Sequence, residues 1–336
     1  MKSIIILVIF CIFCSILNFG CSKDNSPGII TKSLNFKDTK KINTVVSNNL
    51  NAVSFLDSKT GYIVGDSGLI LKTTDEGETW EKLNSGVKST LFCLTVSDAN
   101  ILIGGNELIL KSSDNGNTWL RKDTIYSDIY AILKISEDIG IAVGGFFSTN
   151  AFIEAIYITN NNGYTWVKQK LNFRTGLIRS VLKLNDNSLI IASSDCIDLG
   201  QLCDVGIYKS TGNYSNYKQI YNLKGYGFHS LVSPDGTSII AVGYEGRIIY
   251  SSDAGENWID RKSSYNNPLR SVAYYSKDNY YAVGDSGIII STSDNGQNYT
   301  KLNSNTSNKL RSICFPSQYY GIAVGANGTI IKMLFE

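Results

Sequence analysis

The amino-acid sequence predicts an all-β protein, a seven-bladed β-propeller with four strands in each blade and with the ring closed by an N-terminal strand. The first observation is a box of eight residues at 73–80, which returns at 112–119 and 251–258 with aspartate third, glycine fifth and tryptophan last. The second is that each copy follows two short apolar segments, the first of which ends in glycine. The third is a period of about 40 residues, which is typical of propeller blades.

Seven copies of the apolar strand pair follow one another along the chain. Period-2 patterns rich in β-branched residues, broken by Gly and Asp or Asn, indicate strands joined by turns. The first strand of each pair is expected at 61–65, 101–104, 141–144, 189–192, 239–243, 280–284 and 321–325. Asn161 and Gly212 replace the box aspartate in the third and fourth repeats, which also carry the insertions 146–154 and 193–205. The strand pattern persists in both, so neither repeat is a lost blade.

The last repeat stops soon after its third strand, at 329–332, and lacks both the box and a fourth strand. Segment 38–43 aligns with 79–84, and it precedes the first opening strand by the spacing seen in the other repeats. We therefore expect residues near 39–45 to pair with the last repeat, within a propeller that covers residues 37–336. This closure matters because an open ring would leave strand edges exposed to aggregation.

The aspartate box, hereafter the Asp-box, has a structural explanation. Its carboxylate can accept backbone N–H groups of its own turn, its glycine tolerates positive φ, and its tryptophan can pack against the neighbouring blade. Each box offers a single carboxylate, whereas a hard cation prefers six or more oxygen ligands. We expect no metal and no other cofactor.

The first residues resemble a bacterial lipoprotein signal peptide. Lys2 precedes the apolar run 4–17, which is too short to span a membrane as a mature helix, and Gly20 stands before Cys21. This resemblance implies a signal peptide at 1–20, lipid attachment at Cys21 and a flexible tether at 21–36. It also implies an outer-membrane lipoprotein that faces the periplasm or the cell surface.

Four cysteines lie beyond the signal region. An exported protein folds under oxidising conditions, so Cys196 and Cys203, which are close in sequence, are expected to form a disulfide in the fourth repeat. Cys93 and Cys314 lie in apolar strand patterns and are expected to be buried thiols.

The charge balance gives no support for one class of partner. The chain of 336 residues carries 31 Lys and Arg against 29 Asp and Glu, a formal net charge of +2. A nearly neutral chain gives no reason to expect nucleic acid as a partner. We expect a monomer whose partner is an envelope protein or a glycan.

The second residue of each opening strand is the candidate binding position. These seven residues should converge near the mouth of the central channel, and they are Asn51, Phe92, Tyr130, Arg179, His229, Arg270 and Arg311. Arginine suits bidentate capture of a carboxylate or phosphate, and Phe92 and Tyr130 could stack on a ligand or partner. The alternative is that the arginines only bridge neighbouring blades through salt bridges or carbonyl groups.

The repeat resembles known families. The Asp-box is similar to that of bacterial sialidases, xyloglucanases and sortilin-type receptors. The fuller pattern at 64–75, with Leu310-Arg311-Ser312-Ile313 opening a blade, most resembles the photosystem II assembly and stability factors. The resemblance covers residues 39–336 and implies a propeller that binds protein subunits. Relatives of this kind occur as lipoproteins in non-photosynthetic bacteria, so the photosynthetic role itself is not carried over.

A sialidase-type glycoside hydrolase is the enzymatic alternative, because sialidases hold a carboxylate with three arginines, and Arg179, Arg270 and Arg311 are three. That chemistry also needs a tyrosine nucleophile with a glutamate partner and a separate aspartate, usually on six blades. The Arg-Ile-Pro motif of that family is absent from the sequence. We therefore favour a non-enzymatic, lipid-anchored propeller that binds a protein or glycan at the cell envelope, as an assembly factor or a receptor.

Overall fold

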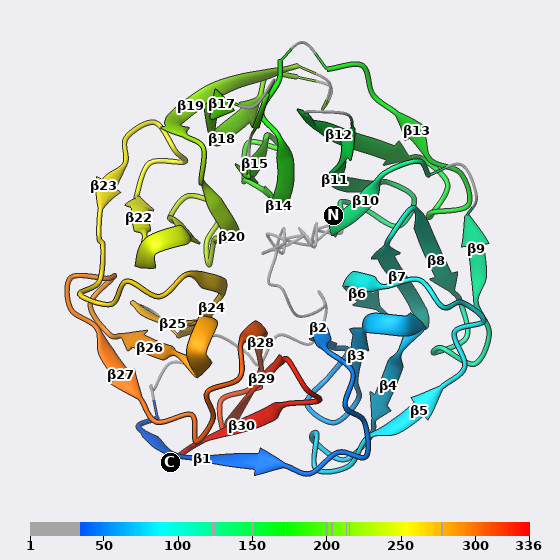
Figure 1. Cartoon of the computed structure of the whole chain (residues 1–336), viewed down its shortest axis with the longest axis vertical. Helices are drawn as coiled ribbons and strands as arrows, with labels where there is room; N and C mark the ends of the chain where they lie inside the picture. Colours follow the sequence, from blue (N-terminus) through cyan, green and yellow to red (C-terminus); the bar gives the residue numbers. More distant parts are fainter. Residues whose placement is uncertain are drawn as a thin grey trace, which may run out of the picture.

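The computed structural model describes residues 34–336 apart from 123–124, 149–150, 172, 196, 199–200, 203, 213, 215 and 277. Seven four-stranded antiparallel sheets form a ring around a central axis, which confirms the predicted seven-bladed propeller (Figure 1). The predicted signal peptide, Cys21 and most of the predicted tether lie outside the described residues. Among the residues described, no helix is both long and apolar enough to cross a membrane.

Each blade runs from an inner strand beside the axis to an outer strand at the rim. Blades 1 to 4 are made of β2 (Leu50–Phe55), β3 (Gly61–Gly65), β4 (Ile70–Thr73) and β5 (Glu81–Leu83); β6 (Leu91–Ser97), β7 (Asn100–Gly105), β8 (Leu108–Ser112) and β9 (Leu120–Lys122); β10 (Asp128–Lys134), β11 (Gly140–Ser148), β12 (Ala151–Thr159) and β13 (Val167–Lys168); and β14 (Leu177–Lys183), β15 (Leu189–Ser194), β18 (Asp204–Ser210) and β19 (Tyr217–Lys224).

The remaining blades follow the same order, and a small extra hairpin interrupts blade 4. Blades 5 to 7 are made of β20 (Phe228–Val232), β21 (Ile239–Gly243), β22 (Ile248–Ser251) and β23 (Ile259–Asp260); β24 (Leu269–Ser276), β25 (Asn279–Gly284), β26 (Ile289–Thr292) and β27 (Thr300–Leu302); and β28 (Leu310–Ser317), β29 (Tyr320–Gly325), β30 (Ile330–Phe335) and β1 (Phe36–Ile42). The extra hairpin is β16 (Ile197–Asp198) with β17 (Gln201–Leu202), within the predicted insertion.

Blade 7 joins the two ends of the chain, as predicted. Strand β1 pairs antiparallel with β30, with Thr39 opposite Met333 and Ile42 opposite Ile330. Asn35 and Glu336 extend this ladder by exchanging two backbone hydrogen bonds of 2.9 and 3.0 Å. The closing strand begins at Phe36, three residues before the expected start of pairing near residue 39.

The core lies between neighbouring blades. At the closure seam, for example, Ile63 and Leu71 of blade 1 share one buried cluster with Ile322 and Val324 of blade 7. Each blade therefore buries both of its faces against its neighbours, which is why the strands in the middle of each blade are apolar on both sides.

The Asp-boxes close the turns on the opposite face from the start of the inner strands. In blade 2, Asp114 accepts hydrogen bonds from the Thr118 amide (2.9 Å), the Thr118 hydroxyl (2.6 Å) and the Ser112 hydroxyl (2.7 Å). The Thr118 bonds, followed by that of Ser112, lower the pKa of Asp114 to about 2. Gly116 has a φ of +83°, as the motif predicts.

The aspartate can be replaced because its job is hydrogen bonding. Asn161, which stands in the third box, accepts from the Thr165 amide at 2.8 Å and from the Thr159 hydroxyl at 3.0 Å. An amide oxygen thus does the work of the carboxylate, which supports a structural role for the box.

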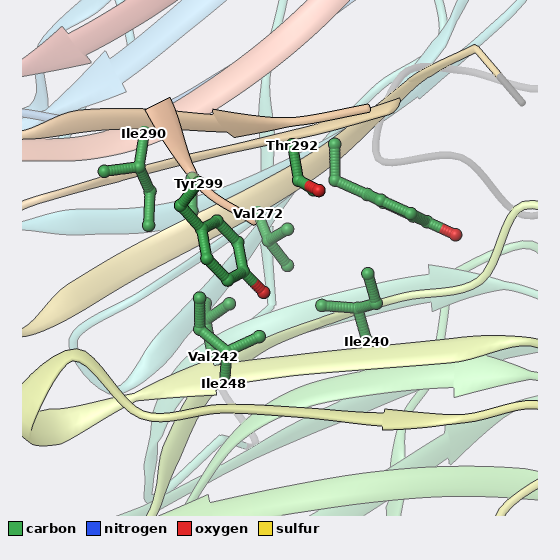
Figure 2. A pocket seen from close by; sticks show the side chains of 9 residues that line it. Ile240, Val242, Ile248, Val272, Ile290, Thr292 and Tyr299 are labelled. Carbon is green, nitrogen blue, oxygen red and sulfur yellow. The ribbon is translucent and has the colours of Figure 1, made fainter. Parts of the chain in front are cut away.

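A small apolar cavity of about 10 Å³ between blades 5 and 6 leads to a first prediction. Figure 2 shows Tyr299 of blade 6 directed toward Val242 and Ile248 of blade 5. Its hydroxyl is buried and has no hydrogen-bond partner among the described residues. Because a buried unsatisfied hydroxyl is costly, we expect Tyr299→Phe to raise the free energy of unfolding by about 1 kcal/mol.

Urea denaturation of Tyr299→Phe measures this change. The matched control is Tyr244→Phe, which removes a hydroxyl that does form a hydrogen bond, to Asp195. The control should lose stability, and a loss for Tyr299→Phe as well would contradict the assignment of its hydroxyl as unsatisfied.

Candidate functional site

The seven candidate residues lie at one structural position, a β-bulge near the start of each inner strand. At the start of every inner strand the pairing with the second strand skips one residue, and the skipped residue is the predicted one. A bulge leaves its extra residue unpaired and re-aims the side chain. All seven residues are partly buried. We call them the bulge ring: Asn51, Phe92, Tyr130, Arg179, His229, Arg270 and Arg311.

Two of the ring arginines are held by carboxylates of their own blades. Arg270 binds Asp285 in a bidentate pair, in which Nε donates to Oδ1 and Nη2 to Oδ2, both at 2.8 Å. Arg179 donates from Nη2 to Asp195 Oδ2 at 3.0 Å and from Nε to the Ser194 hydroxyl at 3.2 Å. In both blades the acid follows the second strand, at the turn that lies beside the bulge.

Further contacts join blades 4, 5 and 6. The Tyr244 hydroxyl of blade 5 donates to Asp195 Oδ1 of blade 4 at 2.6 Å. Arg270 Nη1 of blade 6 lies 2.8 Å from His229 Nε2 of blade 5. Asp195 and Arg270 therefore connect neighbouring blades through the bulge ring, which is the bridging role offered by the sequence as one alternative.

We call the bulge ring, together with Asp195, Tyr244 and Asp285, the belt. Aromatic and amide contacts continue it through blades 1 to 4. Asn51 Nδ2 donates to the Leu91 carbonyl of blade 2 at 2.8 Å. The rings of Phe92 and Tyr130 lie 5.0 Å apart, and the Arg179 guanidinium lies 3.9 Å from the centre of the Tyr130 ring. Stacking of Arg179 on Tyr130 is a favourable cation–π contact. Phe92 and Tyr130 thus pack within the belt.

The two acids are ionised despite their burial. Burial alone would raise the pKa of Asp195, but the charge of Arg179 and the Tyr244 hydroxyl hold it below its usual value. Burial likewise opposes ionisation of Asp285, and Arg270 and then Lys309 hold its pKa below the usual value. The belt is therefore built from charged pairs at neutral pH.

His229 stands neutral within the belt and supplies a pH prediction. Burial, and then the positive charge of Arg270, lower the pKa of His229 to about 3. An unfolded chain has a histidine pKa near 6.5, so the unfolded state binds more protons between these values. The free energy of unfolding is therefore not reduced by His229 above about pH 6.5. As the pH is lowered below that value, this group reduces it by at most about 1.4 kcal/mol per pH unit.

The chain has a single histidine, so the difference between wild type and a His229 variant from pH 6.5 to 5 reports on His229. We expect urea unfolding of the wild-type protein to show this loss of stability and His229→Asn to show a flatter profile there. Identical slopes for the two proteins would contradict the neutral buried imidazole.

Arg311 differs from the other two ring arginines. In blade 7, Ala326 stands at the turn position that Asp285 occupies in blade 6. Arg311 Nε is buried and has no hydrogen-bond partner in the described part of the chain. The neighbouring Lys309 turns to Asp285 instead, at 3.4 Å. Arg311 is thus the ring arginine without a carboxylate among the described residues.

In the described part of the chain, three aromatic side chains are exposed on the same side as the bulge ring. Tyr126 precedes β10 and is 73% exposed, Phe147 near the β11–β12 turn is 59% exposed, and Tyr226 precedes β20 and is 51% exposed. The ring of Tyr226 lies 5.0 Å from that of Tyr244. The sequence prediction did not single out these residues, because Tyr126 and Tyr226 lie in connections before inner strands and Phe147 lies in the insertion of blade 3, where the repeat carries no signal.

The prediction also missed Asp195, Asp285 and Tyr244, which complete the belt. A signal was available, since each lies 15 or 16 residues after the ring residue of its own blade. Cys93 and Cys314 are buried, as expected. Cys196 and Cys203, the predicted disulfide, lie outside the described residues.

The tyrosines near the ring arginines do not match the sialidase arrangement. Tyr130 donates to Asp128 at 3.1 Å and Tyr244 to Asp195 at 2.6 Å, so each pairs with an aspartate rather than with the glutamate that a sialidase uses. Arg179 and Arg270 are already occupied by carboxylates of the protein. In the described part of the chain, no three His, Cys, Asp or Glu side chains are grouped so as to hold a metal ion.

A polar hollow of about 210 Å³ lies on the Asp-box face, between the segment before β1 and blade 6. Asp294 and Asn298 line it, together with Asn35. The Asp294 carboxylate is engaged by its own box, accepting from the Asn298 amide at 2.9 Å and from the Asn298 side chain at 2.8 Å. Its polar groups therefore serve the turn, and the bulge-ring face is the better candidate site.

Comparison with known proteins places the chain beside one family. Residues 32–197 match the model of the family described as the photosynthesis system II assembly factor YCF48. A solved structure described as YCF48 bound to D1 peptide is 18% identical with a TM-score of 0.71, covering 90% of this chain and 99% of that one. YCF48 from Cyanidioschyzon merolae is also 18% identical, with a TM-score of 0.68 and coverage of 89% and 99%.

The propeller fold is shared more widely. A streptogramin B lyase structure is 12% identical with a TM-score of 0.69, and the match covers 89% of this chain and 97% of the lyase. No curated protein matches the sequence. At these identities the solved structures establish the fold alone.

Proposed function

We propose that this Asp-box β-propeller, which resembles the photosystem II assembly factors in sequence signature and fold, is a non-enzymatic module that binds a protein segment on its bulge-ring face. The observation that carries the proposal is the exposure of Tyr126, Phe147 and Tyr226 around a belt of ordered side chains. Exposed aromatic residues beside arginine are characteristic of protein interfaces. The D1 peptide in one YCF48 structure supports a protein segment as the kind of partner.

The belt also favours binding over catalysis. Asp195 and Asp285 are each held by an arginine, so neither is free to act as a general acid or base. Such pairs fix the surface before a partner arrives, and a preorganised surface loses less entropy on binding.

Anchoring and location complete the proposal. The signal-like segment before Cys21 supports a lipid anchor that would hold the propeller at the cell envelope, as an assembly factor or a receptor. Replacement of Cys21 by serine should move the protein from the membrane fraction to the soluble fraction. Retention of Cys21→Ser in the membrane fraction would contradict the anchor and leave the binding face unaffected.

Site-specific photo-crosslinking in native cells tests the binding face. A photoreactive phenylalanine at Tyr226 should capture a discrete protein, which is then purified and tested for direct binding. Tyr164 in the third Asp-box is the matched control, because it is also 51% exposed but lies on the opposite face. Equal capture at both positions, or capture at Tyr164 alone, would refute the assignment. A glycan partner would give no discrete protein at Tyr226.

A further inference from the structure

The geometry points to Arg311 as the docking position for a carboxylate of the bound protein segment. This inference rests on the proposed function and adds to it the chemical group that the face selects. It also divides the three ring arginines by role, since Arg179 and Arg270 are structural and Arg311 alone is left for a partner.

Blades 6 and 7 have the same backbone at this position. In blade 6 the Asp285 amide donates to the Pro268 carbonyl at 3.0 Å, and in blade 7 the Ala326 amide donates to the Lys309 carbonyl at 2.8 Å. The next residues, Ser286 and Asn327, have φ values of +57° and +54°. Ala326 therefore takes the place of Asp285 in an otherwise matching turn.

The bulges match as well. The ladder of β24 skips the residue between Leu269 and Ser271, and that of β28 skips the residue between Leu310 and Ser312. Arg311 thus begins from the position from which Arg270 reaches its carboxylate. What blade 7 lacks is the acid, because the alanine side chain ends at Cβ.

The surroundings of Arg311 do not replace the missing acid. Asp285 of blade 6 is engaged by Arg270 at 2.8 Å and by Lys309 at 3.4 Å. Asp66 of blade 1 accepts from the side chains of Asn49 at 2.8 Å and Asn51 at 2.9 Å. Both neighbouring carboxylates are therefore committed to other donors.

Two groups are unsatisfied on the neighbouring inner strands of blades 7 and 1. Arg311 Nε is a buried donor without an acceptor, and Asn51 Oδ1 is a buried acceptor without a donor, within the described residues. Elsewhere in the ring, Arg179 and Arg270 are satisfied by their blades. A buried polar group without a partner is unfavourable, so both groups favour a ligand that supplies what each lacks.

A peptide carrying an acidic side chain fits this pair of requirements. Its carboxylate would meet Arg311 as Asp285 meets Arg270, and its backbone supplies N–H groups for an acceptor such as Asn51 Oδ1. We expect a carboxylate and not a phosphate at Arg311, because the equivalent residues Arg179 and Arg270 both bind carboxylates. Charge-assisted pairs of this type are short and strong.

The test titrates N-acetyl-aspartyl amide into the full-length protein at constant ionic strength and follows the arginine Nε–Hε signals by NMR. The Arg311 signal, assigned through Arg311→Lys, should shift saturably, while the signals of Arg179 and Arg270 stay in place. N-acetyl-asparaginyl amide is the neutral matched probe, and it should bind at least about tenfold more weakly. Inorganic phosphate is the third probe, and a response to phosphate equal to that for the aspartyl probe would overturn the carboxylate assignment.

The decisive variant is Ala326→Asp, which gives blade 7 the acid that blade 6 already has. This variant keeps Arg311 and its charge but supplies a carboxylate within the protein. The Arg311 signal should therefore no longer shift when N-acetyl-aspartyl amide is added, while the protein remains folded. A titration that survives in Ala326→Asp, or an Arg311 signal that never responds, would overturn the inference. Because crosslinking at Tyr226 does not depend on Arg311, a captured partner together with a silent Arg311 would refute this inference alone.

Discussion

A chain that begins at Asn43, and therefore lacks β1, is expected to lose its cooperative thermal transition and to form oligomers. Without β1, the six paired positions of β30 have no partner at the rim of blade 7. The buried side chains of Phe335 and Ile330 lose the cover of Phe36 and Ile42. We expect a loss of more than about 4 kcal/mol, which places the deletion among the severe changes. Circular dichroism and size-exclusion chromatography measure both effects.

The matched control is a chain that begins at Leu34, which keeps β1 and should melt as the full chain does. A synthetic peptide of residues 34–46 added to the shorter chain should restore the transition, because the missing strand pairs through its backbone. A monomer that begins at Asn43 and unfolds at the control temperature would show that β1 does not close the ring.

Replacement of Asp195 by alanine is expected to lower the free energy of unfolding by about 2–4 kcal/mol. Three donors lose their acceptor at once, namely Arg179 Nη2, the Ser194 hydroxyl and the Tyr244 hydroxyl. The Arg179 guanidinium, which is largely buried, would be left without its counter-charge. Urea denaturation at pH 7 measures the loss.

Asp195→Asn separates geometry from charge. Its side-chain oxygen can still accept from Tyr244, but it no longer neutralises Arg179, so an intermediate loss is expected. Because the pKa of Asp195 is lowered on folding, its stabilisation is present above pH 4 and disappears as the carboxylate is protonated at lower pH. The gap between wild type and Asp195→Asn should therefore close below pH 4. A loss under about 0.5 kcal/mol for Asp195→Ala would contradict the central role of this carboxylate.

The fold could be predicted because the repeat is written into the sequence. Each blade repeats the same strand alternation, and the Asp-box marks the same turn in most blades. The strands of a degenerate repeat can therefore be assigned by comparison with the clearer repeats. The closing strand could be predicted by the same alignment, although its start at Phe36 could not. That boundary depends on the pairing of Phe36 with Phe335, a contact between chain ends that no repeat records.

The candidate site could be predicted in position but not in role. The repeat singles out one residue near the start of each inner strand, and the structure places these seven residues at equivalent bulges. Whether a ring arginine binds a carboxylate of its own blade depends on the residue at the turn after the second strand. That residue is Asp285 beside Arg270 and Ala326 beside Arg311. The ring positions alone do not carry this information.

The closure of blade 7 also decides where the two chain ends leave the ring. Asn35 and Glu336 are joined by two backbone hydrogen bonds, so whatever is attached to either end departs from a single point on the rim (Figure 1). Every other four-stranded blade is built from strands that follow one another along the chain. A force that pulled the two ends apart would act first on the β1–β30 ladder and would open its hydrogen bonds one after another from the Asn35–Glu336 pair, because the strands are antiparallel and both ends leave at the same point. The ring is therefore closed at one place, and its resistance to force depends on the pairing of β1 with β30.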